Sequence, residues 1–205
     1  MIITIIVNLK FLMVFNVLKV MASKQRNKLI CIFTLMSILQ QQATQAEMII
    51  GKGSIEPGVD LIFEGGVKDD VMPNEHFLSE SETDVHIEVL ANWSSQAPKG
   101  SPEGGHVAYL NINALLVNEV TGRSVTHKLT PHVNMSDNLH YAKNIKLPGR
   151  IDQKYTVIFE IFPPKNDQLG MHYDWRHEVD SQLVDATKFE FQNLDFEEIA
   201  RSRRR

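Results

Sequence analysis

Hydrophobic and polar residues alternate in several short segments of the chain. In the clearest one, Val85, Ile87 and Val89 lie on one side of a predicted strand, and His86 and Glu88 lie on the other. The apolar side is expected to face the core, which leaves an imidazole and a carboxylate together on the opposite side. The pattern predicts strands over residues 59–63, 83–93, 106–118, 124–129, 144–147, 155–162 and 187–191.

The predicted strands are separated by segments that are rich in turn-forming residues. Gly65-Gly66 and Pro73 lie in a loop, Gly122 closes a hairpin turn, and Pro163-Pro164 ends the preceding strand. The segment from 130 to 143 is predicted to be a further loop. About seven short strands without a convincing long helix are typical of an all-β protein folded as a β-sandwich.

The first 46 residues have a different pattern. A basic segment at residues 24–28 precedes an apolar core at 29–39, and small residues follow it up to Ala46. This order is typical of a signal peptide, which we predict over about residues 21–46, with cleavage after Ala46.

Residues 1–20 form a second apolar run that is interrupted by polar and basic residues. We interpret this run as an upstream extension from a misplaced start. An N-terminal membrane anchor is the alternative, because about 20 apolar residues can span a bilayer. The remaining chain is expected to form one domain over residues 47–193, followed by a polar basic tail over residues 194–205.

The amino-acid composition excludes several kinds of functional site in this domain. The single cysteine, Cys31, lies in the signal peptide, so the domain has neither disulfides nor thiolate ligands, and a blue-copper site is excluded. Five of the 21 basic residues and none of the 25 acidic residues precede residue 47, which gives the domain a net charge of −9. An acidic domain is a poor candidate for nucleic-acid binding and is compatible with cations as ligands.

Three segments contain candidate metal ligands. They are Asp84–Glu88 on a predicted strand, His132–His140 in a predicted loop, and Gly170–Asp174 in a long polar loop. We expect the three to converge on a metal ion. The alternatives are a solvent-exposed polar strand face for the first segment and ordinary polar surface loops for the other two.

The second segment leaves the metal open. Met135 is a soft thioether donor, which together with imidazoles suits copper, whereas Asp137 with imidazoles suits Fe(II), Mn(II) or Zn(II).

In this order and spacing, the three segments resemble the bacterial periplasmic iron-transport proteins, which bind copper and iron and accompany an inner-membrane iron permease. The resemblance rests on Asp84–Glu88, on Pro131–Ile145 with its Ser-Asp-x-x-His-Tyr core, and on Gly170-Met171-His172. It implies an immunoglobulin-like sandwich that forms a homodimer, with metal sites near the dimer interface.

The resemblance also implies roles for individual residues. Histidines that bind copper in the family match His86 and His140, acidic residues beside the site match Glu88 and Asp137, the Gly-Met-His histidine matches His172, and a family glutamate matches Asp60. One position departs from the family, because His132 stands where the family has a methionine. Either His132 or Met135 is expected to occupy that position, and only Met135 would supply the soft sulfur donor of the family.

The resemblance makes a periplasmic iron-uptake protein the first hypothesis for function. Such a protein would bind copper and iron, with zinc or manganese as substitutes, and deliver iron to the permease. The alternatives are a copper-dependent redox enzyme that oxidises Fe(II), and a β-sandwich interaction module that binds no metal.

Overall fold

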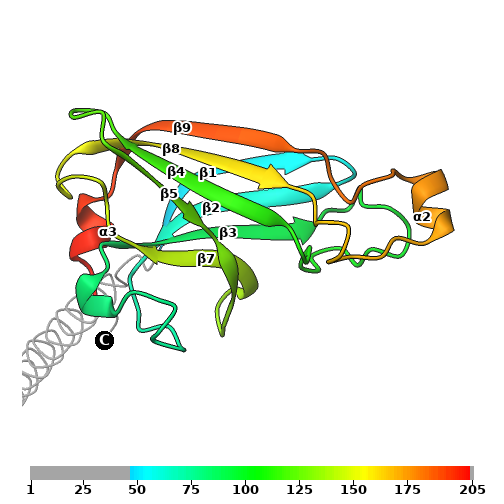
Figure 1. Ribbon diagram of the computed structural model, residues 1–205, viewed down its shortest axis with the longest axis horizontal. Coiled ribbons are helices and arrows are strands. Elements are labelled where there is room, and N and C mark those ends of the chain that lie inside the picture. The colour runs from blue at the N-terminus through cyan, green and yellow to red at the C-terminus, as the bar shows by residue number, and fades with distance from the viewer. Residues whose placement is uncertain (1–46, 204–205) are drawn as a thin grey trace, which may run out of the picture. The chain divides into compact units, whose positions relative to one another are not determined.

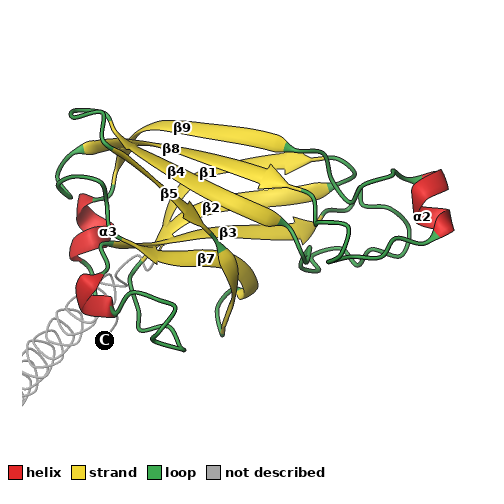
Figure 2. Ribbon diagram, in the orientation of Figure 1, coloured by secondary structure: helices red, strands yellow, loops and turns green. Residues whose placement is uncertain are grey.

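The computed structural model describes residues 47–203, which form a β-sandwich of two antiparallel sheets (Figures 1 and 2). This confirms the predicted all-β, immunoglobulin-like fold. The predicted signal peptide and residues 1–20 lie outside the described residues. The strands are β1 (Glu47–Ile55), β2 (Val59–Gly66), β3 (Val85–Trp93), β4 (Asn111–Asn118), β5 (Ser124–Lys128), β6 (Thr130–Asn134), β7 (Asn138–Ile145), β8 (Lys154–Phe162) and β9 (Thr187–Asp195).

The strand order is β1-β2-β3-β7-β6 in the five-stranded sheet and β5-β4-β8-β9 in the four-stranded sheet. Between them lies an apolar core that contains several aromatic rings. Phe63 of β2 packs against Phe159 of β8 and Phe189 of β9, with ring centroids 4.6 and 5.1 Å apart. As predicted, Val85, Ile87 and Val89 point into this core.

The segment that we predicted as a loop from 130 to 143 is instead a hairpin of β6 and β7. The prediction was wrong because Pro131 and the asparagines were taken as signs of a loop, although an edge strand such as β6 tolerates proline. The turn forms around Asn134, whose Oδ1 accepts from the backbone N–H groups of Ser136 and Asp137 at 2.9 and 2.6 Å.

Two other boundaries differ from the prediction. The strand predicted from residue 106 begins at Asn111, and His106 makes only an isolated bridge to Asn92. The glycine-rich segment from residue 47, for which no strand was predicted, forms β1 and pairs with β2.

Three short helices complete the described chain: η1 (Glu80–Glu82), α2 (Tyr173–Glu178) and α3 (Glu197–Arg201). Phe196, Ile199 and Ala200 are buried in the core, so the segment that we expected to be a polar tail begins inside the sandwich. Lys68 Nζ donates to the carbonyl of Ala200 and ties α3 to the end of β2. No helix among residues 47–203 is long and apolar enough to cross a membrane.

The outer face of the five-stranded sheet is partly covered. In Figure 1, the loop between β2 and β3 and the β6–β7 hairpin lie on the same side of the sandwich. Asn144 of β7 donates through Nδ2 to the carbonyls of Asp69 and Leu78 in that loop, at 2.8 and 2.7 Å. Because of this cover, polar side chains on β3 and β7 are removed from water.

Candidate metal centre

Three histidines from three strands meet on this covered face. His86 comes from β3, and His132 and His140 are direct cross-strand partners on β6 and β7. Their exposed fractions are 6%, 9% and 2%. One nitrogen of each ring lies within 4.8 Å of the others, so a single ion could be bound by all three.

Asn144 fixes the orientation of the His86 ring. Its Nδ2 donates to the two loop carbonyls, so its Oδ1 is the acceptor for His86 Nδ1 at 2.6 Å. His86 therefore carries its proton on Nδ1 and its lone pair on Nε2. An outer hydrogen bond of this kind is what holds a metal-binding histidine in the correct tautomer.

His140 and Glu88 meet beside the other two histidines. His140 Nδ1 donates to the carbonyl of Asn138 at 3.1 Å, which leaves the lone pair of the neutral ring on Nε2. That Nε2 lies 3.4 Å from Glu88 Oε2, and both side chains are almost fully buried. Two acceptor atoms face each other favourably only when they share a proton or a metal ion, so the residues present fit a metal.

His132 is kept neutral by its surroundings. Burial, and then the neighbouring charges of His86 and His140, lower its pKa to about 4. The ring packs edge-on against Phe77, with centroids 4.9 Å apart, and Nε2 lies 3.2 Å from Thr130 Oγ1. Since histidine binds metal only in the neutral form, His132 is ready to act as a ligand at neutral pH.

A second donor group adjoins the histidines. Oxygen atoms of Glu88 and Asp137 lie within 4.8 Å of each other and of a nitrogen of His140. Asn134 Nδ2 donates to Asp137 Oδ2 at 2.6 Å and orients that carboxylate. The hairpin must therefore curl over the sheet, since Asp137 lies at its turn and Glu88 lies in the middle of β3.

Gly66 makes space for the carboxylate of Glu88. A Cβ placed on Gly66 would lie only 2.1 Å from Glu88 Oε1. The Glu88 carboxylate therefore extends over β2 at Gly66, and a side chain at this position would displace it.

A cavity of about 360 Å³ leads from solvent to the three histidines. Its wall also includes Phe77 and Met72, and it is lined on one side by β6. An ion can therefore reach the histidines without unfolding the sandwich.

Several of the predicted ligands lie outside both groups. Met135 is fully exposed at the hairpin turn, whereas His132 is buried beside the other two histidines, so the geometry of the chain favours His132 as the donor. Asp60 is exposed at the beginning of β2, opposite Asn92. His172 is exposed at the N-terminus of α2, which Figure 1 places at the far end of the sandwich from α3.

Sequence reasoning missed Glu64, which it placed in a loop. Glu64 is the cross-strand partner of Glu88 and is only 4% exposed. Burial, followed by the negative charges of Glu47 and Asp137, raises its pKa to about 7. Leu61 and Phe63 alternate with outward-facing residues of β2. If the predicted strand had been continued by one residue, Glu64 would have been placed on the outer face, as Glu88 was.

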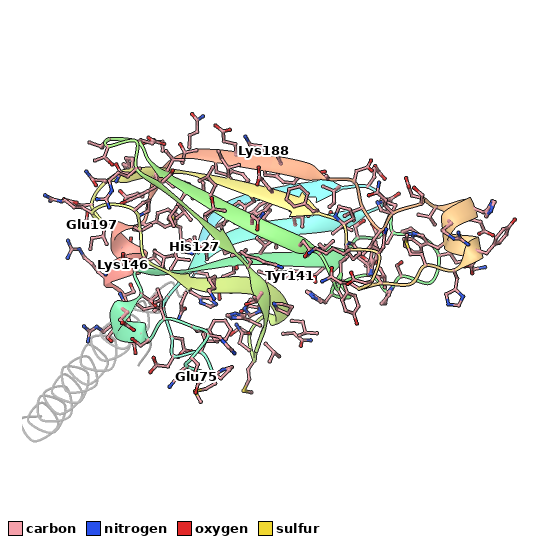
Figure 3. All side chains as sticks on the ribbon, in the orientation of Figure 1. Glu75, His127, Tyr141, Lys146, Lys188 and Glu197 are labelled. Atoms are coloured by element: carbon pink, nitrogen blue, oxygen red, sulfur yellow. The ribbon has the colours of Figure 1, made fainter. Side chains whose placement is uncertain are left out.

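The core anchors the strand that carries His140. The Tyr141 hydroxyl is buried, donates to the carbonyl of Val107 at 2.7 Å and accepts from the N–H of Leu110 at 3.0 Å (Figure 3). Because adjacent residues of a strand point to opposite faces, this inward anchor fixes His140 on the outward face.

Comparison with known proteins supports this picture. The sequence profile of a family described as Fe2+ transport protein matches residues 44–198. No curated protein sequence shows significant similarity to the chain.

Solved structures of two proteins are similar to this one. A copper-bound methionine-to-isoleucine variant of Campylobacter jejuni P19 is 26% identical, with a TM-score of 0.62 over 72% of this chain and 96% of that chain. A copper-bound glutamate-to-glutamine variant of FetP from uropathogenic Escherichia coli is 25% identical, with a TM-score of 0.58 over 71% of this chain and 95% of that chain. FetP as isolated, after recombinant expression in the periplasm of E. coli, is 26% identical, with a TM-score of 0.58 over 72% of this chain and 94% of that chain.

Proposed function

Because this chain belongs to the Fe2+ transport protein family, we propose that it is a periplasmic protein that binds copper and iron during iron uptake. The observation that carries the proposal is the group of three buried histidines next to two carboxylates. Buried histidines and carboxylates that converge from separate strands cost folding energy unless they are paired or bind a metal.

Copper is the metal proposed for the histidine group. Imidazole nitrogen is a good donor for copper, and the similar structures of P19 and FetP are copper-bound. His132 replaces a sulfur donor of the family pattern, so the site is less selective for Cu(I) and accepts Zn(II) or Mn(II) more readily. When bound, copper would supply a fixed positive charge that neutralises the Glu88 carboxylate.

Iron is the proposed cargo, and we assign it to the carboxylate side of the centre. Glu88 and Asp137 provide oxygen donors, which are preferred by harder cations such as Fe(II), Fe(III) and Mn(II). The protein would hold iron there and deliver it to an inner-membrane permease. The predicted signal peptide would export the chain to the compartment in which such a carrier works.

A homodimer would explain the position of His172. This residue lies at the end of the sandwich marked by α2 and belongs to neither donor group of its own chain. In a dimer, it would reach the metal centre of the partner chain. Copper affinity should then depend on protein concentration in the wild type, and His172→Ala should remove this dependence. Concentration-independent affinity of a wild-type monomer would contradict the dimer.

Elemental analysis of protein reloaded with copper and iron tests the main proposal. We expect about one equivalent of copper, which His86→Ala combined with His140→Ala removes, lowering affinity by more than about 100-fold because two of three ligands are lost. His177→Ala, an exposed histidine of α2, is the matched control and should bind normally. A wild-type protein with less than about half an equivalent of any metal, unchanged in the double variant, would exclude the proposal.

A redox role is the second candidate, because His140 belongs to both donor groups and would place copper next to iron. Oxygen-dependent oxidation of Fe(II) by the copper-loaded protein, absent from the copper-free protein, would identify an enzyme that oxidises iron. Absence of turnover would leave a carrier. A large separation of His86 and His140 would favour the third hypothesis, a metal-free interaction module, but their ring centroids are only 6.3 Å apart.

A further inference from the structure

The carboxylate side of the centre contains a residue that neither the sequence motifs nor the histidine geometry identified. Glu64 lies on β2, directly opposite Glu88 on β3. Phe63 points into the core, so the next residue, Glu64, points to the outer face, where the metal centre lies. Cβ atoms of such cross-strand partners are about 5 Å apart, so the Glu64 side chain lies next to the group formed by Glu88, Asp137 and His140 and would join that group by turning toward it.

Glu64 is buried, and one of its two carboxyl oxygens lacks a hydrogen-bond donor among the described residues. Its side chain is 4% exposed, and the oxygen without a donor is Oε2. A carboxyl group in this condition is normally eliminated from a protein interior because its desolvation is not offset. A cation bound by the carboxylate oxygens would offset this desolvation.

The neighbours of Glu64 are also acidic. Glu47 and Asp137 are close enough for their charges to act on Glu64, and Lys52 opposes them from β1. The Glu88 carboxylate extends over Gly66, two residues along β2 on the same face as Glu64. Three carboxyl groups from β2, β3 and the hairpin turn therefore surround one region of the outer face.

From this geometry we propose that Glu64 is an oxygen ligand, and that with Glu88 and Asp137 it forms a second cation position beside the three histidines. The position would take a hard divalent or trivalent cation such as Fe(II), Fe(III) or Mn(II), because its donors are carboxylate oxygens. This inference rests on the proposed function, since it assigns a ligand to the iron side of the same centre.

Glu64 also determines selectivity between the two positions. The histidine group accepts soft or borderline ions, and each added carboxylate favours a harder ion with higher charge. With Glu64 present, iron and copper would bind on different sides of His140. Without it, only two carboxylates remain, and one of these, Glu88, also faces the histidine group.

The test uses metal-free full-length protein that is first loaded with one equivalent of Cu(II) and then titrated with Mn(II), which is stable in air. Free Mn(II) is measured by electron paramagnetic resonance. Glu64→Gln keeps the shape of the side chain and removes its charge. We expect the Mn(II) dissociation constant to rise at least about tenfold and the Cu(II) constant to change less than about threefold.

The matched control is Glu56→Gln, an exposed glutamate at the end of the same sheet, which should leave both constants within about twofold of the wild type. A structural role for Glu64 predicts a lower melting temperature of the metal-free Gln variant. The ligand role predicts an unchanged or higher one, because an unpaired buried acid has been removed. Glu64→Leu, which has no oxygen donor, should weaken Mn(II) binding at least as much as Glu64→Gln does and should keep Cu(II).

Mn(II) affinity in Glu64→Gln equal to that of the wild type would overturn the inference while leaving the proposed function intact. A wild-type protein that binds Cu(II) but no second ion would overturn both the inference and the proposed iron position, and would leave only the copper site. A wild-type protein that binds neither Cu(II) nor Mn(II) would instead exclude the proposed function itself.

Discussion

The two outer faces of the sandwich carry polar side chains for different reasons. On the four-stranded sheet, residues of β8 alternate between buried and partly exposed positions, and β9 pairs Lys188 with Glu190 at 3.8 Å in solvent (Figure 3). On the five-stranded sheet, the first five residues of β3 are all buried, including His86 and Glu88. Polar groups on the first face are hydrated, whereas those on the second have lost water and must find other partners.

Burial of polar groups marks the face of the five-stranded sheet as the place where a ligand is bound. An exposed pair such as Lys188 and Glu190 contributes little and can vary freely. A buried group of histidines and carboxylates destabilises the fold unless a ligand compensates it. The comparison therefore predicts large effects for changes on the face that carries β3 and small effects for changes on the face that carries β9.

Asn144→Ala should have the largest effect, because this buried residue holds His86 and two loop carbonyls at once. Copper affinity is expected to fall by about 10- to 100-fold, as is typical when the outer partner of a metal ligand is lost. The free energy of unfolding should fall by about 1–3 kcal/mol for each buried group left unsatisfied. Isothermal titration and urea denaturation measure the two effects.

Asn144→Asp separates the two roles of this side chain. An aspartate still accepts from His86 Nδ1 but cannot donate to the carbonyls of Asp69 and Leu78. Copper affinity should recover more than stability does. Wild-type copper affinity in the alanine variant would show that the orientation of His86 is fixed by other contacts.

Gly66→Ala should have the next largest effect, because the added Cβ would lie 2.1 Å from Glu88 Oε1. Displacement of that carboxylate should lower Mn(II) affinity by about tenfold. Overpacking should also reduce the free energy of unfolding by about 1–3 kcal/mol. Gly170→Ala is the matched control, since a Cβ there meets nothing within 4 Å; equal behaviour of the two variants would contradict the steric role of Gly66.

The metal-free protein should lose stability in acid, with an intermediate effect. Burial lowers the pKa of His106, His127 and His132, the last to about 4. The unfolded chain therefore binds more protons below its ordinary histidine pKa of about 6.5, and stability falls from there toward about pH 4. Chemical denaturation at a series of pH values would measure this slope.

Glu64 acts in the opposite direction and allows a control. Its pKa is raised to about 7, so the folded protein binds the extra proton, and stability rises as the pH falls from about 7 toward 4.5. In Glu64→Gln this compensation is lost, and the decline between about pH 6.5 and 4.5 should become steeper than in the wild type. Parallel profiles of the two proteins would show that Glu64 is not a buried acid in solution.

Lys188→Ala should have the smallest effect. The side chains of Lys188 and its partner Glu190 are both exposed, at 55% and 41%. We expect the free energy of unfolding to change by less than about 0.5 kcal/mol, with copper and Mn(II) affinities unchanged. A loss of metal binding in this variant would mean that the two faces are coupled and that the comparison does not hold.

Much of the fold followed from local patterns in the sequence. Alternation at Val85, Ile87 and Val89 correctly identified the core side of β3 and the outer position of His86 and Glu88. Turn residues such as Gly122, which adopts a φ of 70°, correctly separated β4 from β5. These signals suffice because strand periodicity and turn conformation are properties of a few adjacent residues.

The residues that form the centre could not all be predicted from their neighbours in the sequence. Choosing between His132 and Met135 requires the register of β6 against β7, which pairs His132 with His140 and leaves Met135 at the turn. Glu64 was assigned to a loop because Gly65-Gly66 resembled a turn, although these glycines continue β2 beside β3. Cross-strand neighbours are set by the sheet as a whole, so they became visible only in three dimensions.

The β6–β7 hairpin gives the metal centre a kinetic property of its own. β6 is an edge strand that pairs only with β7, yet this hairpin carries His132, Asp137 and His140. Lifting its tip separates one wall of the centre from the wall formed by β3, without opening the core that Tyr141 anchors. If the protein is the metal carrier proposed above, local opening of this small, exposed element would set the residence time of a bound ion, and the cargo would leave in far less time than the sandwich takes to unfold.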